Sequence, residues 1–160
     1  IVNVLYLVKE GLLDVPVLYL SRQIVRTKSD YYRLLQAVRE GDAWEEWVVY
    51  MLSAVERTAA EGIDAIKAIR TALFDYKHRI REQHRFYSKD LINNLFSHPY
   101  TRIEFIQRDL SVSRLTATKY LDALTATGFL HKRKIGRSNY YINLPLYGIL
   151  TGESMQGNEA

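Results

Sequence analysis

Apolar residues recur at helical spacing through most of this chain, which predicts a protein built mainly from α-helices. The first three helical segments cover residues 1–10, about 14–27 and about 29–41. Gly11 and Gly41 follow or close the first and third segments, and glycine is the residue most often found just past the end of a helix. The pattern therefore predicts short helices separated by tight turns.

Capping residues suggest where the second and third helices begin. Asp14 can accept a hydrogen bond from the first turn of the second helix, and Pro16 suits that first turn because it lacks an N–H that would need a partner. Either Ser29 or Asp30 can cap the third helix in the same way.

A longer helix is expected to begin near Asp42, with Glu45 and Glu46 in its first turn, where acidic side chains complement the helix dipole. Apolar residues on one side of this helix predict a buried stripe. The stripe consists of Trp44, Trp47, Val48, Met51, Leu52 and Val55. Gly62 is expected to break or kink the helix.

Residues 63–86 contain neither proline nor glycine, and their apolar positions recur at alternating spacings of three and four. These positions are Ile66, Ile69, Leu73, Tyr76 and Ile80. The spacing is that of a coiled-coil seam about two heptads long. Two explanations stand: the seam packs against another helix of the same chain, or it joins two copies in a homodimer.

Past residue 87 the pattern predicts three short helices. Ser88 can cap a helix over 89–96. The segment Thr101–Glu104 has the form of a capping box, so a second helix should begin there. The residues from Asp109 to Val112 are expected to form a turn, after which Ser113 caps a third helix that runs to about Thr127.

The third of these helices has one apolar face and one polar face. Val112 precedes it, and Ala117, Leu121 and Leu124 are spaced to point toward a core, with Ile103, Phe105 and Ile106 supplied by the helix before it. The opposite face is the one that could meet phosphates and base edges. It carries Arg114, Thr116, Thr118, Lys119 and Tyr120.

Gly128 should end this helix, and a β-hairpin follows. Strands are expected over 129–135 and 138–144, joined by a turn at Gly136-Arg137. Phe129, Tyr140 and Ile142 are expected to point inward. The hairpin also carries four basic residues with no acid between them: Lys132, Arg133, Lys134 and Arg137.

Helices followed by a basic hairpin in this order predict a winged helix-turn-helix. The fold class is therefore mostly α: a helical bundle joined by a long helix to a winged helix-turn-helix with a small β-hairpin. We expect helices and the long connecting helix over 1–87, the winged unit over 88–150, and a disordered tail over 151–160.

Charge is distributed unevenly along the chain. Residues 88–150 contain nine Lys or Arg against four Asp or Glu, whereas residues 1–87 contain 13 against 12. A basic excess on one domain is typical of proteins that bind nucleic acid. The winged unit is thus expected to bind double-stranded DNA through the polar face and hairpin residues named above, or to serve as a protein-interaction or regulatory module.

Several other classes of function find no support in the sequence. The chain has no cysteine and its four histidines lack ligand spacing, so neither disulfides nor a metal site are expected. No apolar run approaches the roughly 20 residues of a membrane span, and no signal peptide is recognisable. We expect a cytoplasmic protein without membrane association.

The first third of the chain resembles the C-terminal part of the Fic (filamentation-induced-by-cAMP) domain. The resemblance rests on the apolar helix Ile1–Gly11, on LYLSR at 18–22, on the DYY helix that begins at Asp30, and on the GDxxxW-type segment at 41–47. It covers about residues 1–60 in the family's order. A long helix followed by a winged helix is similar to the C-terminal extension of many bacterial Fic proteins. Residues 1–87 would then be the last helices of a Fic domain with the connecting long helix.

The resemblance implies an enzyme that transfers AMP from ATP to a hydroxyl group of a protein substrate, with ATP and Mg²⁺ as cofactors of the intact parent. The family's catalytic loop, H-x-F-x-[D/E]-G-N-G-R-x-x-R, is absent from this sequence and would precede Ile1. No catalytic residue is therefore assigned, and no cofactor is expected for the chain alone. Asn3 and Tyr6, on the helix that follows such a loop, are candidates for lining the nucleotide pocket.

Two functional hypotheses follow. In the first, the chain is the C-terminal fragment of a Fic-type protein adenylyltransferase, and the winged helix binds DNA or protein or regulates the enzyme. A chain that opens with Ile1 inside an apolar helical pattern suits such a fragment. In the second, the chain is a winged-helix transcription regulator.

Overall fold

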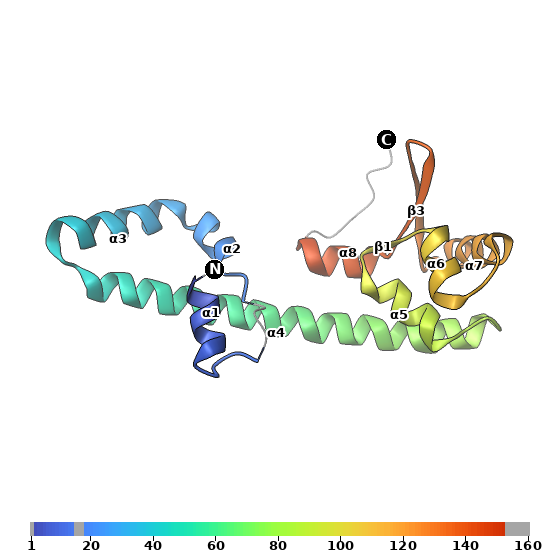
Figure 1. The fold of residues 1–160 in the computed structure, drawn as a ribbon, viewed down its shortest axis with the longest axis horizontal. Coiled ribbons are helices and arrows are strands. Elements are labelled where there is room, and N and C mark those ends of the chain that lie inside the picture. The colour runs from blue at the N-terminus through green and yellow to red at the C-terminus, as the bar shows by residue number, and fades with distance from the viewer. Residues whose placement is uncertain (1, 15–17, 153–160) are drawn as a thin grey trace. The chain divides into compact units, whose positions relative to one another are not determined.

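The computed structural model describes residues 2–14 and 18–152 (Figure 1). Its elements in chain order are α1 (Val2–Lys9), α2 (Leu20–Arg26), α3 (Lys28–Gly41), α4 (Trp44–Gln83), α5 (Lys89–Ser97), β1 (Tyr100–Thr101), α6 (Ile103–Leu110), α7 (Arg114–Ala126), β2 (His131–Ile135), β3 (Ser138–Ile142) and α8 (Leu144–Thr151). The mostly α class and the long helix are thereby confirmed. No described helix is both long enough and apolar enough to cross a bilayer.

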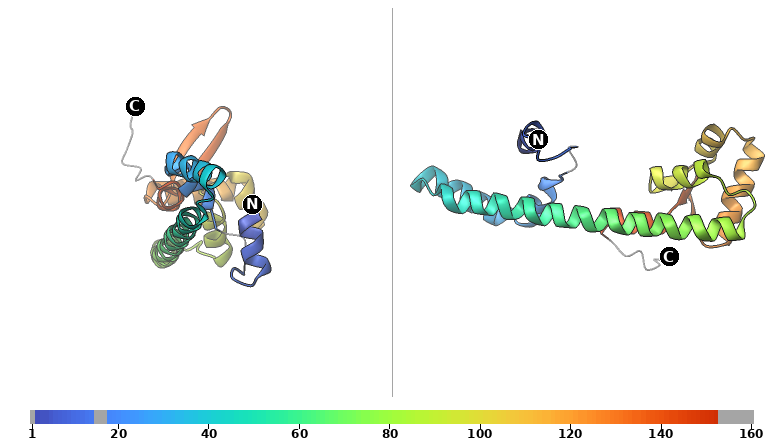
Figure 2. Two further views of the ribbon diagram at one scale, coloured as in Figure 1. Left: turned by 90° about the vertical axis from the view of Figure 1, so that its left-hand side faces the viewer. Right: turned by 90° about the horizontal axis from the view of Figure 1, so that it is seen from below.

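The chain divides into two compact units, Ile1–Asp64 and Ala65–Ala160, and the boundary lies inside α4. We call them the N-terminal unit and the C-terminal unit. In the N-terminal unit, α3 and the first half of α4 lie side by side as a helical hairpin, as both figures show (Figures 1 and 2). Asp42 forms the turn with φ of 57°.

Aromatic side chains hold this helical hairpin together. The Tyr31 ring meets the Trp47 ring edge-on, with centroids 5.1 Å apart, and Trp47 stacks against Tyr50. The Thr27 and Tyr50 hydroxyls are hydrogen-bonded at 2.8 Å. Aromatic pairs of this geometry add stabilisation beyond their buried area, so a few aromatic residues fix the register of α3 on α4.

Two helix starts differ from the sequence prediction. The second helix begins at Leu20 rather than near Asp14, and no side chain caps it. Residues 15–17, which include Pro16, lie outside the described residues. The third helix begins at Lys28, so Ser29 lies inside its first turn and does not cap it. Neither α2 nor α3 has a side-chain cap hydrogen bond at its start.

The stripe predicted to be buried on α4 is largely exposed. The exposed fractions of Trp44, Val48 and Leu52 are 56%, 48% and 64%. The spacing correctly placed these residues on one helix face, but a face becomes core only where another element covers it. Gly62 does not break the helix, which runs without interruption from Trp44 to Gln83, because a single glycine inside a helix costs only about 1 kcal/mol.

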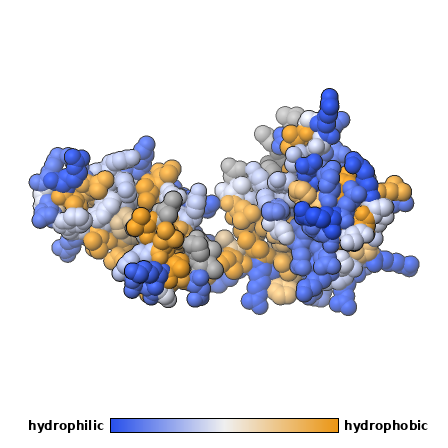
Figure 3. All heavy atoms as spheres, viewed as in Figure 1, coloured by the Kyte–Doolittle hydropathy of each residue, from blue (hydrophilic) through white to orange (hydrophobic). Residues whose placement is uncertain are grey.

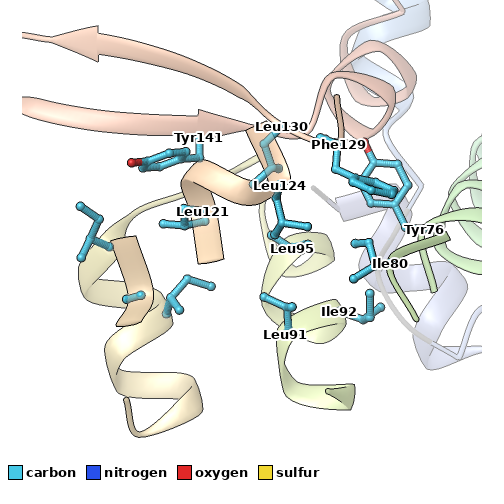
Figure 4. Close-up of a cluster of buried hydrophobic side chains, with 13 residues drawn as sticks. Tyr76, Ile80, Leu91, Ile92, Leu95, Leu121, Leu124, Phe129, Leu130 and Tyr141 are labelled. Atoms are coloured by element: carbon cyan, nitrogen blue, oxygen red, sulfur yellow. Dashed lines mark hydrogen bonds between the residues drawn. The ribbon is translucent and has the colours of Figure 1, made fainter. Parts of the chain in front are cut away.

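The C-terminal unit is a winged helix-turn-helix. Its sheet has the order β1-β3-β2 with antiparallel pairs, and β2 and β3 form the wing. The core gathers side chains from α4, α5, α6, α7 and both ends of the wing (Figure 4). Its fully buried members include Ile80, Leu91, Leu95, Ile106, Ala117, Leu121, Leu124, Phe129 and Tyr141. The prediction that Ala117, Leu121 and Leu124 face the core is confirmed.

The last turns of α4 belong to this core. Ile80 is 0% and Tyr76 is 3% exposed, and Tyr76 donates a hydrogen bond of 2.7 Å from its hydroxyl to the carbonyl oxygen of Phe129. Burial raises the pKa of Tyr76 to about 12. The seam is thus explained by packing within one chain at these two positions, whereas Ile66 is 64% exposed. For the same reason the unit boundary lies at residue 64 rather than at residue 87.

Helix caps in the C-terminal unit were predicted with mixed success. Ser88 and Ser113 cap α5 and α7, each accepting a hydrogen bond from a backbone N–H of the first turn. The capping box was wrong: Arg102 is the N-cap residue of α6, and Thr101 instead donates a hydrogen bond of 2.6 Å to Asn94. Thr101 pairs with Tyr141 in the sheet, which turns its side chain away from the helix.

The wing begins and ends two residues inside its predicted limits, at His131 and Ile142. The inward-facing residue of β3 is Tyr141, which is fully buried, and its neighbours Tyr140 and Ile142 are only half-buried. Because side chains alternate between the faces of a strand, an error of one residue reverses the whole assignment. Two adjacent tyrosines hid the correct alternation.

Two elements of the C-terminal unit were not predicted from sequence. The strand β1 has only two residues, and α8 begins where the second strand of the wing was expected to end. Asn143 caps α8, and its side-chain amide also donates to the carbonyl oxygen of Leu95. The predicted disordered tail falls mostly on residues 153–160, which lie outside the described residues.

Candidate nucleic-acid interface

Helix α7 is fixed in the C-terminal unit by its buried face, so its other face is presented outward. Ala117, Leu121 and Leu124 are each 0% exposed. Ser113 caps the start of the helix, where its hydroxyl oxygen accepts a hydrogen bond of 3.2 Å from the backbone N–H of Thr116. The helix therefore offers a well-anchored surface on which side chains can meet a partner.

The five residues predicted on this outer face divide into two groups. Arg114 and Lys119 are exposed, and within the described part of the chain neither side chain makes a hydrogen bond or ion pair. Thr116, Thr118 and Tyr120 are half-buried and already engaged. The hydroxyl of Thr118 donates to the carbonyl oxygen of Arg114 at 2.9 Å.

Thr116 and Tyr120 also have partners within the fold. The Thr116 hydroxyl is hydrogen-bonded to the Ser113 hydroxyl at 2.9 Å. The Tyr120 ring stacks on Phe86, with centroids 4.2 Å apart and planes 10° apart. These contacts stabilise the start of α7 and its packing on the segment after α4, so these side chains already have partners within the fold.

One of the wing's basic residues is paired with another residue of the fold. The Lys132 ammonium nitrogen lies 2.8 Å from Asp122 Oδ1, and the same oxygen accepts a 3.2 Å hydrogen bond from the Tyr141 hydroxyl. The hydrogen bond with Asp122 raises the pKa of Lys132. Lys132 therefore ties the wing to α7.

The other three basic residues of the wing are exposed and project from different positions. Arg133 and Lys134 are adjacent on β2, so they point to opposite faces of the hairpin. Arg137 follows Gly136 in the turn, where Gly136 has φ of 59°. Within the described residues, none of these three side chains has a hydrogen bond or ion pair.

One further basic residue, missed from sequence, lies beside this set. Arg102 makes cation–π contacts with two rings. Its Cζ atom lies 5.5 Å from the ring centroid of Tyr140 and 5.8 Å from that of Phe105. Glu104 Oε2 lies 3.3 Å from its Nε. The local sequence had placed Arg102 inside a capping box, and its contact with the Tyr140 ring is apparent only in the tertiary structure. Hydrophilic residues dominate the visible face of this unit (Figure 3).

Comparison with protein families identifies this part of the chain. Residues 73–146 match the family model described as protein adenylyltransferase SoFic-like, C-terminal domain. These residues are similar to the C-terminal domain of SoFic-like protein adenylyltransferases. The expected relation to the Fic family is thereby confirmed for the matched residues.

The limits of this match agree with the packing of the C-terminal unit. The match begins at residue 73, so it includes Tyr76 and Ile80 and excludes most of α4. Both residues are buried in the winged unit. The last turns of α4 are therefore part of the domain, both by the family's limits and by the packing of the core.

Outside the matched residues, the N-terminal unit has an apolar groove of about 790 Å³ lined by α1, α2, α3 and α4. Tyr6, Trp47 and Leu52 are among the lining residues, so the exposed stripe of α4 forms part of one wall. Hydrophobic side chains gather over α1 and α2 on the visible face of this unit (Figure 3). The side chain of Asn3, the other candidate for a nucleotide pocket, lies outside the described residues.

The groups that ATP and Mg²⁺ would need are not gathered in this groove. None of its lining residues is charged, so it offers no cation to a triphosphate. In the part of the chain that the structure describes, no three of His, Asp or Glu cluster as metal ligands. The residues present therefore do not fit the nucleotide and metal ion, and no chemical step is assigned to them.

Proposed function

We propose that this chain is the C-terminal part of a Fic-type protein adenylyltransferase, and that its winged unit binds double-stranded DNA. The observation that carries the DNA-binding proposal is that five basic side chains on α7 and the wing are exposed and have no partner among the described residues. They are Arg114, Lys119, Arg133, Lys134 and Arg137. They project from the outer face of α7 and from the wing, which are the two elements that winged helices present to a duplex.

The chemistry of the five side chains suits the phosphate backbone. Three other cations of the C-terminal unit are paired within the fold: Lys132 with Asp122, Arg108 with Asp109 and Arg79 with Asp75. Unpaired cations that meet phosphates release condensed counterions, so the binding constant falls steeply with salt concentration. Phosphate contacts position a protein on DNA without selecting a sequence. Weakly selective, salt-sensitive binding is the expected behaviour.

Titration of a fluorescently labelled duplex with the full 160-residue chain tests this proposal. We expect binding at low salt, and we expect the logarithm of the binding constant to fall linearly with the logarithm of the salt concentration. Because each lost phosphate contact lowers that slope by about one, the double variant Arg133→Ala/Lys134→Ala, which removes the cation from both faces of the wing, should lower it by at least about one. A variant of matched charge loss, Arg81→Ala/Arg85→Ala on and after α4, is the control and should keep the slope.

Absence of duplex binding at low salt contradicts the DNA-binding proposal. Equal losses in the wing variant and in its control also contradict it, because net charge alone would then explain the binding. Selective binding to one operator-like sequence would instead favour the second hypothesis, a transcription regulator, since base selection requires direct contacts in the groove.

AMP transfer belongs to the intact parent in this proposal, because the family's catalytic loop is not among these 160 residues. The chain alone should not label a protein mixture with radioactive AMP from ATP. A parent protein that contains the loop is the positive control in the same assay. Labelling by the 160-residue chain contradicts this assignment.

A further inference from the structure

A small polar pocket lies where the start of α6, the start of α7 and the turn of the wing come together. Three arginines, Arg102, Arg114 and Arg137, line it together with Glu104, Ser138 and Asn139. Its volume of about 60 Å³ is four to six times the roughly 10–15 Å³ that holds one water molecule. The pocket can therefore take a compact group of about five heavy atoms, such as a phosphate, and cannot take a nucleoside.

The pocket contains an unsatisfied donor. Arg102 Nε is buried and has no hydrogen-bond partner, and it is the one such side-chain atom among the described residues. Glu104 Oε2 lies 3.3 Å away, near enough for an ion pair but without the alignment of a hydrogen bond. Buried donors without acceptors are rare in proteins, because a missing hydrogen bond is not replaced by water. An acceptor brought by a ligand would satisfy this N–H.

The three guanidinium groups give the pocket a positive charge that only one carboxylate opposes. The side chains of Arg114 and Arg137 have no partner within the described residues, and Arg102 is held between the rings of Phe105 and Tyr140. Helix α6 begins here without a side-chain cap, so its positive end adds to the same field. Guanidinium groups bind phosphate oxygens through paired N–H donors. Because the two rings already hold the Arg102 side chain, it loses little conformational entropy when it binds a phosphate.

We infer that Arg102, Arg114 and Arg137 bind one phosphate group of a DNA backbone that docks on α7 and the wing. This inference rests on the proposed DNA-binding function and names the contact that anchors it. The duplex is favoured over a phosphorylated protein because Lys119, Arg133 and Lys134 continue the positive surface on α7 and the wing. One phosphate in the pocket and others along these residues match the repeated charges of a backbone.

The test uses the full chain, a labelled duplex and three variants. Arg102→Ala should weaken duplex binding about tenfold at low salt and lower the salt slope by about one. Glu104→Gln removes the competing carboxylate and should tighten binding several-fold. Arg81→Ala removes an equal charge from the exposed part of α4, and its affinity should stay within about twofold, because it lies outside the proposed phosphate contacts.

A second measurement reads the pocket directly. Titration with inorganic phosphate, followed by the NMR signal of the Arg102 Nε–H, should give a saturable shift that Arg114→Ala weakens. Because Arg102 packs on two rings, its replacement by alanine can unfold the unit. In that case Arg102→Lys is the variant to measure. The lysine in that variant would keep the charge but lose the paired donors, so its duplex binding should be intermediate.

The outcomes separate this inference from the broader proposal. Duplex binding by the wild-type chain that Arg102→Ala weakens no more than Arg81→Ala overturns the pocket and leaves the proposed function in place. No duplex binding, combined with saturation of the Arg102 signal by a phosphopeptide, overturns the duplex as the source of the phosphate. No shift of that signal with inorganic phosphate, with the duplex or with a phosphopeptide overturns the pocket as a phosphate site.

Discussion

Lys132 and Asp122 join the wing to helix α7 through an ion pair of 2.8 Å. The pair is partly exposed, so its contribution is that of a surface pair, about 0.2–1 kcal/mol. We expect Lys132→Ala to lower the free energy of unfolding by about that amount while leaving the salt slope of duplex binding unchanged. Urea denaturation and duplex titration of the same variant provide the two readouts.

Lys134→Ala is the matched comparison, since Lys134 lies on the same strand and its side chain has no partner in the described residues. Its stability should equal that of the wild type, whereas its salt slope should fall by about one. If Lys132→Ala and Lys134→Ala lower the salt slope equally, then Lys132 also contacts the duplex and its assignment to the ion pair with Asp122 alone is wrong.

The hydroxyl of Tyr76 links α4 to the winged core. It donates to the Phe129 carbonyl at 2.7 Å in a buried setting. Tyr76→Phe leaves that carbonyl without a partner, which costs about 1–3 kcal/mol. Chemical denaturation should show this loss, and Tyr87→Phe, which removes a hydroxyl from a half-buried tyrosine nearby, should cost less. Unchanged stability in Tyr76→Phe would contradict the packing described for the end of α4.

The unit boundary predicts which truncations fold. A fragment of residues 65–152 retains Tyr76 and Ile80 and should unfold cooperatively in a thermal melt. A fragment of residues 88–152 lacks both side chains, and removal of two large buried residues costs several kcal/mol, comparable to the whole stability of a small domain. Cooperative unfolding of the shorter fragment at the same temperature would place the boundary near residue 87 after all.

Asp109 should give the C-terminal unit an acid-sensitive contribution. The hydrogen bond from Arg108, and then that from Asn94, holds the pKa of Asp109 below its ordinary value of 3.8. A depressed carboxylate pKa means that the stabilisation is fully present above the unfolded pKa and is lost as pH falls through the folded one. Wild-type stability should therefore fall between about pH 5 and about pH 2 by more than that of Asp109→Asn, as measured by urea midpoints. Parallel pH profiles of the two proteins would exclude this contribution.

Local signals were sufficient wherever the structural choice was itself local. Ser88 and Ser113 were recognised as caps because each accepts a hydrogen bond from a backbone N–H only three residues further along the chain. The spacing of Ala117, Leu121 and Leu124 placed them on one helix face, and that face is the core. A helix's period determines which residues share a side, whatever the rest of the chain does.

Predictions failed where a distant segment made the choice. Thr101 caps nothing, because its pairing with Tyr141 in the sheet turns its hydroxyl toward Asn94. The alternation of Tyr140 and Tyr141 depends on which strand lies beside β3. The α4 stripe that includes Trp44 and Leu52 was placed correctly on one face but is exposed, because burial requires a covering element that sequence spacing does not specify.

The candidate site shows the same division. Sequence alone identified a winged unit with a basic excess and named nine residues for its binding surface. Only the tertiary structure decided that Lys132 is paired with Asp122, that Tyr120 stacks on Phe86, and that Arg102 joins Arg114 and Arg137 around a pocket. The physical reason is that charge and helical period are properties of the chain itself. Whether a given cation is paired, stacked or left for a ligand depends on neighbours brought in from far along the sequence.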